Sequence, residues 1–345
     1  MRYDVKERVD TLWAAATAGD EHAAADAALA TLDAGVPMET LLLDVVAKVQ
    51  SRVGQEWATN RITVAQEHTA TAVNERVLAT LARHPSVRRD PEPGRGRVTV
   101  ACVHGEWHAF PARLLAEVLR LRGWHVDYLG AQVPTPYLVE HLHRTNPDAA
   151  ALSASLATRL PAAHAAITSC QAAGTPVLAG GAAFGPDGRY ARLLGADAWA
   201  PDAGAAADLL AGGPLPRRPP PGRGADGPHL AGHEYATLTG SAGDLVRGAV
   251  AELTRRVPEA AAAYAEHQLG HPAEDVAYIV GFLGASLYVD DPGLFVSYVG
   301  WTAEMLAARG IPARVLLSVL DALAGRLRGL PHALATLAEA QAVLG

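Results

Sequence analysis

The chain has 345 residues, enough for about two or three domains of the usual size. Its formal net charge is -7 and its arginines form no basic cluster, which argues against nucleic-acid binding. The longest uncharged apolar run, 276–289, is shorter than the roughly 20 residues of a bilayer span, so we expect no membrane partner. The charged N-terminus and the two cysteines, Cys102 and Cys170, predict a cytoplasmic protein with free thiols.

Residues 1–84 predict a bundle of four helices. Breaks at residues 18–20, 35–37 and 60–61 divide this segment into four parts. Within the parts, apolar residues recur at spacings of three and four, as is typical of amphipathic helices. This spacing is seen at Leu41, Leu42, Val45, Val46 and Val49. A small helical bundle is the structure that this pattern favours.

Residues 95–211 predict a Rossmann-like domain. Short β-branched or apolar runs at 97–103, 125–130, 150–155 and 175–181 alternate with helical patterns. Strands that alternate with helices indicate a parallel, doubly wound sheet, whose ligand crevice lies at the carboxyl ends of its strands. Polar residues just after each strand are therefore the candidates for a site.

Residues 212–232 are rich in proline and glycine and predict a linker. From 233 to 345 the pattern is helical throughout, with five or six helices separated by Gly-x-Pro segments. Asp291, before Pro292, is a predicted N-cap. The fold class is thus α/β and multidomain: a helical bundle, a doubly wound parallel sheet and an all-α domain.

Glu106 and His108 follow the first predicted strand, with His104 close by. A metal-binding imidazole usually needs its second nitrogen held by a carboxylate or carbonyl group, and Glu106 could hold His108 in this way. The alternative is an ordinary hydrogen-bonded loop histidine.

Three short segments resemble the cobalamin-binding domain, whose pattern is Asp-x-His-x-x-Gly, then Ser-x-Leu, then Gly-Gly. They are "EWHAFP" at 106–111, Ser153-Ala154-Ser155, and Gly180-Gly181. The resemblance implies that His108 is the lower axial ligand of cobalt and that Glu106 replaces the aspartate that orients it. It also implies that Ser153 meets the nucleotide tail and that the glycine pair lets the tail pass close to the backbone. Pro111 and Ser155 depart from the pattern, which has Gly and Leu there.

The helical bundle carries a second resemblance. Trp57 is followed after nine residues by Glu67-His68, with Val64 between them. This spacing resembles that of the light-sensing cobalamin repressors, in which the Trp shields the upper axial group and the Glu-His pair lies over it. A bulky 5′-deoxyadenosyl group needs such an apolar wall with a few polar contacts. The resemblance therefore implies that residues 1–84 cap an adenosylcobalamin.

Two features differ from those repressors. Ala58 stands where they have the histidine that takes the upper cobalt position after photolysis, so water or another histidine, such as His68, would take it. Their winged-helix module has no counterpart in this sequence, and we expect no direct DNA binding.

The order of cap, cobalamin domain and helical domain resembles that of the photocobilins, photoreceptors that hold adenosylcobalamin and biliverdin. The resemblance implies that residues 233–345 form a globin-like, bilin-binding domain. Neither cysteine lies there, so biliverdin would bind noncovalently. Groups that could meet the bilin or its propionates are Arg247, Arg255, His267, His271, Tyr298 and Arg314. The alternative is a packed helical core or a dimer interface.

These resemblances together imply a non-enzymatic cytoplasmic photoreceptor that signals when light cleaves the cobalt–carbon bond and loss of the adenosyl group rearranges the cap. We expect a homodimer with an unidentified downstream signalling protein as partner. The alternatives are a corrinoid methyl carrier of a methyltransferase system, or a cobalamin-dependent regulator whose helical tail dimerises.

Overall fold

The computed structural model describes residues 4–85, 91–92, 94–217, 233–257 and 272–345. It separates into two compact units. The first comprises residues 1–57 and 61–221, and the second comprises 58–60 and 222–345. Most of the predicted linker, residues 218–232, lies outside the described residues.

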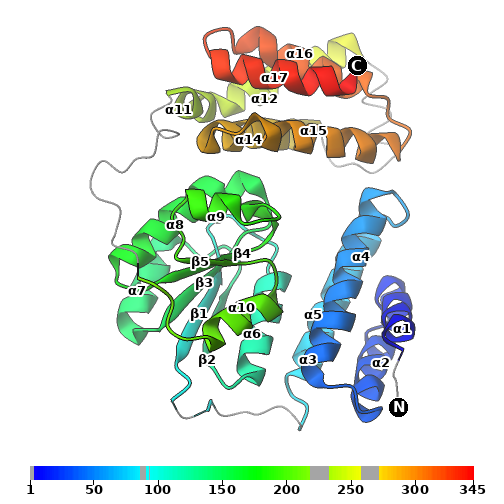
Figure 1. Cartoon of the computed structure of the whole chain (residues 1–345). Coiled ribbons are helices and arrows are strands. Elements are labelled where there is room, and N and C mark those ends of the chain that lie inside the picture. The colour runs from blue at the N-terminus through cyan, green and yellow to red at the C-terminus, as the bar shows by residue number, and fades with distance from the viewer. Residues whose placement is uncertain (1–3, 86–90, 93, 218–232, 258–271) are drawn as a thin grey trace. The chain divides into compact units, whose positions relative to one another are not determined.

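The first unit begins with the predicted helical cap (Figure 1). Helix ends coincide with the sequence breaks: Gly19, in the left-handed conformation with a φ of 74°, ends the first helix. Asp20 caps the second, and Thr63 opens the last with a capping box to Gln66. The helices are α1 (Val5–Ala18), α2 (Glu21–Asp33), the consecutive pieces α3 (Met38–Thr40), η1 (Leu41–Val46) and α4 (Ala47–Ala58), and α5 (Val64–Leu81).

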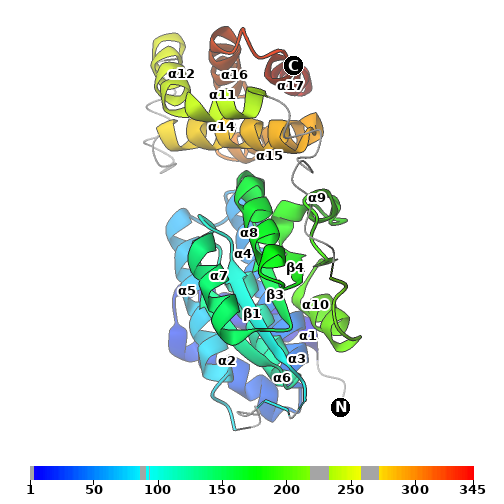
Figure 2. The same ribbon diagram turned by 90° about the vertical axis from the view of Figure 1, so that its left-hand side faces the viewer.

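A five-stranded parallel sheet follows, in the order β2-β1-β3-β4-β5. The strands are β1 (Arg97–Cys102), β2 (His125–Gly130), β3 (Ala149–Ser153), β4 (Val177–Gly180) and β5 (Ala198–Ala200). The helices are α6 (Phe110–Leu121), α7 (Thr135–Thr145), α8 (Leu160–Ala172), α9 (Arg189–Leu193) and α10 (Ala203–Ala211). α6 packs against α10 on one face and α7 against α8 on the other (Figures 1 and 2). The strand order reverses between β1 and β3, which is where ligands bind in such folds.

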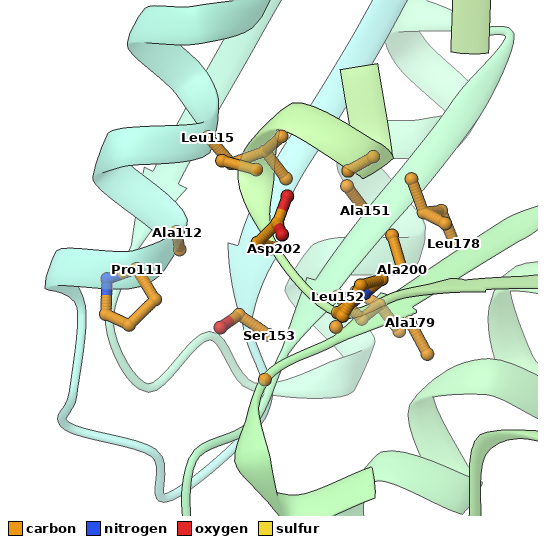
Figure 3. A pocket seen from close by; sticks show the side chains of 15 residues that line it. Pro111, Ala112, Leu115, Ala151, Leu152, Ser153, Leu178, Ala179, Ala200 and Asp202 are labelled. Atoms are coloured by element: carbon orange, nitrogen blue, oxygen red, sulfur yellow. The ribbon is translucent and has the colours of Figure 1, made fainter. Parts of the chain in front are cut away.

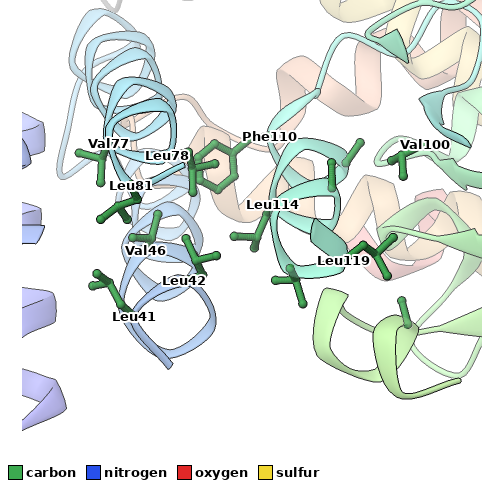
Figure 4. Close-up of a cluster of buried hydrophobic side chains, with 14 of the residues drawn as sticks. Leu41, Leu42, Val46, Val77, Leu78, Leu81, Val100, Phe110, Leu114 and Leu119 are labelled. Carbon is green, nitrogen blue, oxygen red and sulfur yellow. The ribbon is translucent and has the colours of Figure 1, made fainter. Parts of the chain in front are cut away.

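The cap and the sheet domain share one apolar core. Leu42, Leu78 and neighbouring residues of η1 and α5 face Phe110 and Leu114 of α6 (Figure 4). Burial of these side chains against one another is the main attraction between the two parts.

An ion-pair cluster adds to this contact. Arg122, just after α6, pairs with Glu39 of α3 through two hydrogen bonds of 3.2 and 2.6 Å. The same guanidinium donates to Asp208 of α10 at 2.5 Å. One arginine therefore ties the cap to both helices on that face of the sheet.

The second unit is helical, as predicted, with six helices among its described residues. Asp291 caps α15 by accepting the N–H of Gly293, as expected. No described helix has both the length and the apolar character needed to cross a membrane. The helices are α11 (His233–Gly240), α12 (Ala242–Arg256), α14 (Pro272–Val289), α15 (Pro292–Ala307), α16 (Arg314–Arg326) and α17 (Pro331–Leu344).

Candidate functional site

The loop after β1 is organised around Glu106, whose side chain is fully buried. Its Oε1 accepts the backbone N–H of His108 at 2.9 Å and the ring Nδ1–H at 2.5 Å. Its Oε2 accepts the N–H groups of Ser155 and Leu156, at 2.6 and 3.1 Å. Burial alone would raise the pKa of Glu106, but these hydrogen bonds outweigh it and lower the pKa to about 2. Glu106 is thus ionised at neutral pH, and its carboxylate joins the β1 loop to the end of β3.

The imidazole of His108 is oriented by this carboxylate and remains open on its other side. Its side chain is 55% exposed, and the hydrogen bond at Nδ1 leaves Nε2 as the available ligand atom. The pKa of His108 is raised, first by its hydrogen bond to Glu106; burial acts in the opposite direction. The carboxylate of Glu67 raises this pKa further, whereas Arg159 lowers it. His108 therefore lies within electrostatic range of the cap.

A pocket opens at the carboxyl ends of β3, β4 and β5, between α6 and α10 (Figure 3). Its empty volume is about 470 Å³, including space open to solvent. Ser153, Gly180 and Gly181 line it together with Pro111 and Asp202. Most of the other lining side chains are alanine and leucine, so the pocket suits an apolar group with a few polar atoms.

The two pocket glycines have different constraints. Gly181 has a φ of +102°, and a Cβ there would lie 2.3 Å from the carbonyl oxygen of Ala154. Only glycine fits this position. A Cβ on Gly180 would lie 3.5 Å from the nearest atom, the carbonyl oxygen of Ala200, which is an ordinary contact. The backbone therefore tolerates alanine at 180, and glycine there serves to keep the pocket open.

Two buried polar atoms next to the site have no partner among the described residues. They are Oγ1 of Thr158 and Nε of Arg159, in the short 3-10 helix η2 (Ala157–Arg159) that follows β3. The Arg159 guanidinium lies against the β1 loop, since a Cβ on Gly105 would be 2.9 Å from it. Buried donors without protein acceptors are rare and suit a polar ligand. The sequence reasoning missed both residues, because their burial depends on the packed loop.

The cap residues singled out by the sequence lie near the α4–α5 turn. Oε2 of Glu67 lies 2.7 Å from Nδ1 of His68, which is also 2.9 Å from the carbonyl oxygen of Val64. The His68 side chain is 75% exposed, so its Nε2 is open to solvent. Trp57 is half-buried and packs against the core at the end of α4. The Glu-His pair of the motif is thus a real contact in the structure.

The described candidates in the second unit lie on three helices, α12, α15 and α16. Arg247 and Arg255 are exposed on α12 and pair with acidic residues of the same helix. Tyr298 stacks on Phe282, with ring centroids 3.7 Å apart and planes 6° apart. Arg314 is exposed at the start of α16, and His104 is exposed in the first unit. His267 and His271 lie outside the described residues.

Comparison with known families defines the class of this site. Residues 96–210 match a family model described as B12 binding domain, and residues 8–82 match a second model with the same description. The chain therefore contains B12-binding domains, and these indicate a cobalamin or corrinoid cofactor. The matched segments are the sheet domain and the helical cap.

Individual relatives and solved structures match parts of the chain. A 93-residue segment is 33% identical to the HTH-type transcriptional repressor CarA of Myxococcus xanthus, and it covers 27% of this chain and 31% of that protein. The chain thus matches about a third of the length of that relative. The Methanosarcina barkeri monomethylamine corrinoid protein has the same fold, with a TM-score of 0.52 and 20% identity over 60% of this chain and 98% of that one. A cobalamin-binding protein from Desulfitobacterium hafniense DCB-2 also matches, at 17% identity, over 60% of this chain and 97% of that one, but its TM-score of 0.34 supports no structural conclusion.

Proposed function

We propose that this chain is a non-enzymatic photoreceptor that binds adenosylcobalamin between its cap and its sheet domain. The observation that carries the proposal is the Glu106–His108 pair, which leaves one imidazole nitrogen open at the topological switch point of the sheet. When bound, adenosylcobalamin would supply a cobalt–carbon bond that light can break. The residues of this chain hold the cofactor and respond to the loss of its upper group.

On the lower face, His108 would ligate cobalt through Nε2, because Glu106 engages Nδ1. The pocket beside Ser153, Gly180 and Gly181 would hold the nucleotide tail. Ser155 has a different role from the one its motif position suggests: its backbone N–H holds Glu106, and it acts on the cofactor through that carboxylate. Thr158 and Arg159 would donate to the polar periphery of the corrinoid.

On the upper face, Trp57, Val64, Glu67 and His68 would form the wall around the adenosyl group. Glu67 raises the pKa of His108 electrostatically, which supports a site shared by the cap and the sheet domain. A wall built around a bulky group loses contacts when that group leaves. The loss of these contacts would favour a different packing of the cap. That repacking would be the signal passed within a homodimer to a downstream protein.

The second unit would bind biliverdin noncovalently and extend absorption to red light. The stacked pair of Phe282 and Tyr298 supports this, since a flat aromatic surface suits a tetrapyrrole. Arg247, Arg255, Arg314, His267 and His271 remain candidates for its propionates, and a globin-like fold remains a prediction.

Absorbance spectra of protein reconstituted in the dark with both pigments, before and after green and then red illumination, test the proposal. We expect a cobalamin spectral change under green light and a bound red-absorbing band. A light-stable spectrum with tight methylcobalamin binding would instead identify a corrinoid methyl carrier. A light-stable cobalamin complex whose second unit only dimerises would identify a plain cobalamin-dependent regulator.

A further inference from the structure

A chain of hydrogen bonds runs between α4 and α5 of the cap and ends at the Glu67–His68 pair. Nδ2 of Asn74 donates to Oε1 of Gln50 at 2.8 Å, and Nε2 of Gln50 donates to Oγ1 of Thr71 at 2.9 Å. The Thr71 hydroxyl donates to Oε1 of Glu67 at 3.1 Å, and the other oxygen of Glu67 contacts His68. The chain leads from Asn74, which is fully buried, to the largely exposed His68.

The direction of every donor in this chain follows from its last acceptor. An ionised carboxylate can only accept, so Thr71 must donate its single hydroxyl hydrogen to Glu67. The Thr71 oxygen is then left to accept from the amide of Gln50, whose own oxygen accepts from Asn74. Donors aligned in one sense polarise one another, and their combined effect falls on the carboxylate. These hydrogen bonds therefore favour one position of the Glu67 side chain.

Cap stability alone does not explain these residues. Oδ1 of Asn74 is buried without a donor among the described residues, and such an atom is costly. Apolar side chains of similar size between α4 and α5 would remove that cost. Buried polar groups retained against stability are often explained by the geometry that they specify.

The helical spacing shows which faces of α4 and α5 these residues hold together. Thr71 lies one turn after Glu67 on α5, whereas Gln50 lies on α4. Trp57 is seven residues, or about two turns, after Gln50 and so lies on the same face of α4. The hydrogen bonds thus connect the face of α4 that carries Trp57 to the face of α5 that carries Glu67.

We propose that Gln50, Thr71 and Asn74 are positioning residues for the upper face of the cofactor site. They hold the Glu67 carboxylate, and through it His68, in one register against Trp57. They thereby set the selectivity of the cap for the group on the upper side of the corrinoid. This inference rests on the proposed function, because it assigns a role within the proposed upper wall.

The test compares Thr71→Val, which keeps the shape of the side chain but removes its hydroxyl, with Thr71→Ser, which keeps the hydroxyl. Thr80→Val is the matched control, because the Thr80 hydroxyl, also on α5, donates to the backbone oxygen of Arg76 and has no side-chain partner among the described residues. The dissociation constants of adenosylcobalamin and methylcobalamin are measured in the dark for each full-length protein. We expect Thr71→Val to reduce the preference for adenosylcobalamin about three- to tenfold, the range for the loss of one typical hydrogen bond. Thr71→Ser and Thr80→Val should keep the preference of the unmodified chain.

A second readout needs no cofactor. In the free protein, the side-chain amide hydrogens of Gln50 and Asn74 should exchange slowly with solvent, and those of Gln50 should exchange about tenfold faster in Thr71→Val. The double variant Gln50→Leu with Asn74→Leu should unfold at the same or a higher temperature, yet lose the same preference. If these hydrogen bonds served only the stability of the cap, both variants would keep the preference for adenosylcobalamin.

The measurements distinguish failure of the proposed upper wall from failure of the positioning role alone. If the unmodified chain binds the two cobalamins equally or binds neither, the proposed upper wall is wrong and the positioning role falls with it. If the unmodified chain prefers adenosylcobalamin but Thr71→Val keeps that preference, or Thr71→Ser loses it as Thr71→Val does, only the positioning role is overturned.

Discussion

Oε1 of Glu106 contacts His108 twice, through the ring Nδ1 at 2.5 Å and the backbone N–H at 2.9 Å. The two contacts fix the imidazole relative to its own backbone, and the second oxygen fixes both to the end of β3. His108 is therefore oriented before any ligand arrives, which lowers the conformational cost of binding.

The stability of the first unit should fall in acid because of Glu106. Its pKa is lowered to about 2 in the folded chain, from an ordinary value of 4.5. A lowered pKa stabilises the fold above the unfolded value, and this contribution disappears as the pH falls from about 4.5 to about 2. We expect a loss of about 2–3 kcal/mol in the free energy of unfolding, measured by urea denaturation. Glu106→Gln should show a flatter pH profile, and an unchanged profile would contradict the assignment.

Axial ligation by His108 should strengthen as the pH rises. Its pKa lies above the ordinary 6.5, first because Glu106 accepts its hydrogen bond, and a proton on Nε2 competes with cobalt. The absorbance change that marks imidazole coordination should therefore have its midpoint at a higher pH than the same site would show without the two carboxylates. Glu67→Gln should lower this midpoint, because the charge of Glu67 helps to raise the pKa. His108→Ala should abolish the transition at every pH.

Alanine should lower stability at Gly181 and cobalamin affinity at Gly180. Gly181→Ala should destabilise the first unit by roughly 2 kcal/mol or more, because its Cβ would meet the Ala154 carbonyl oxygen at 2.3 Å in a backbone conformation that disfavours side chains. Gly180→Ala should fold normally, because its Cβ has only ordinary contacts, but it should bind cobalamin more weakly. Thermal denaturation and a binding titration check both. Equal stabilities would show that the chain bends at Gly181 without cost.

Removal of the Arg122 cluster should loosen the cap. Arg122→Leu leaves Glu39 and Asp208 without their shared guanidinium, and we expect faster amide exchange in α3 and a loss of about 1–2 kcal/mol. Arg76→Leu is the control, because its pair with Glu21 is exposed and such pairs contribute little. Similar effects of the two substitutions would show that the cap is held by its apolar contact alone.

Much of the fold could be predicted from local patterns. Gly19 and Thr63 mark helix ends by their own chemistry, and the pairing of Glu106 with His108 needs only two residues close in sequence. β5 (Ala198–Ala200) was missed because three residues show no periodicity. Gln50 and Asn74 could not be paired from sequence, because their contact depends on how α4 and α5 pack.

The position of Arg122 has a mechanical consequence. It holds the cap at Glu39, while Trp57 lies 18 residues further along the α3–η1–α4 stretch, roughly 27 Å away at helical rise. The ion pair at Glu39 and the buried side chains of η1, such as Leu42, therefore hold the first part of this stretch, and Trp57 lies at its far end. A rotation of about 5° at the Glu39 end would move the indole by roughly 2 Å, so a small change in how the cap sits on α6 becomes a larger displacement at Trp57.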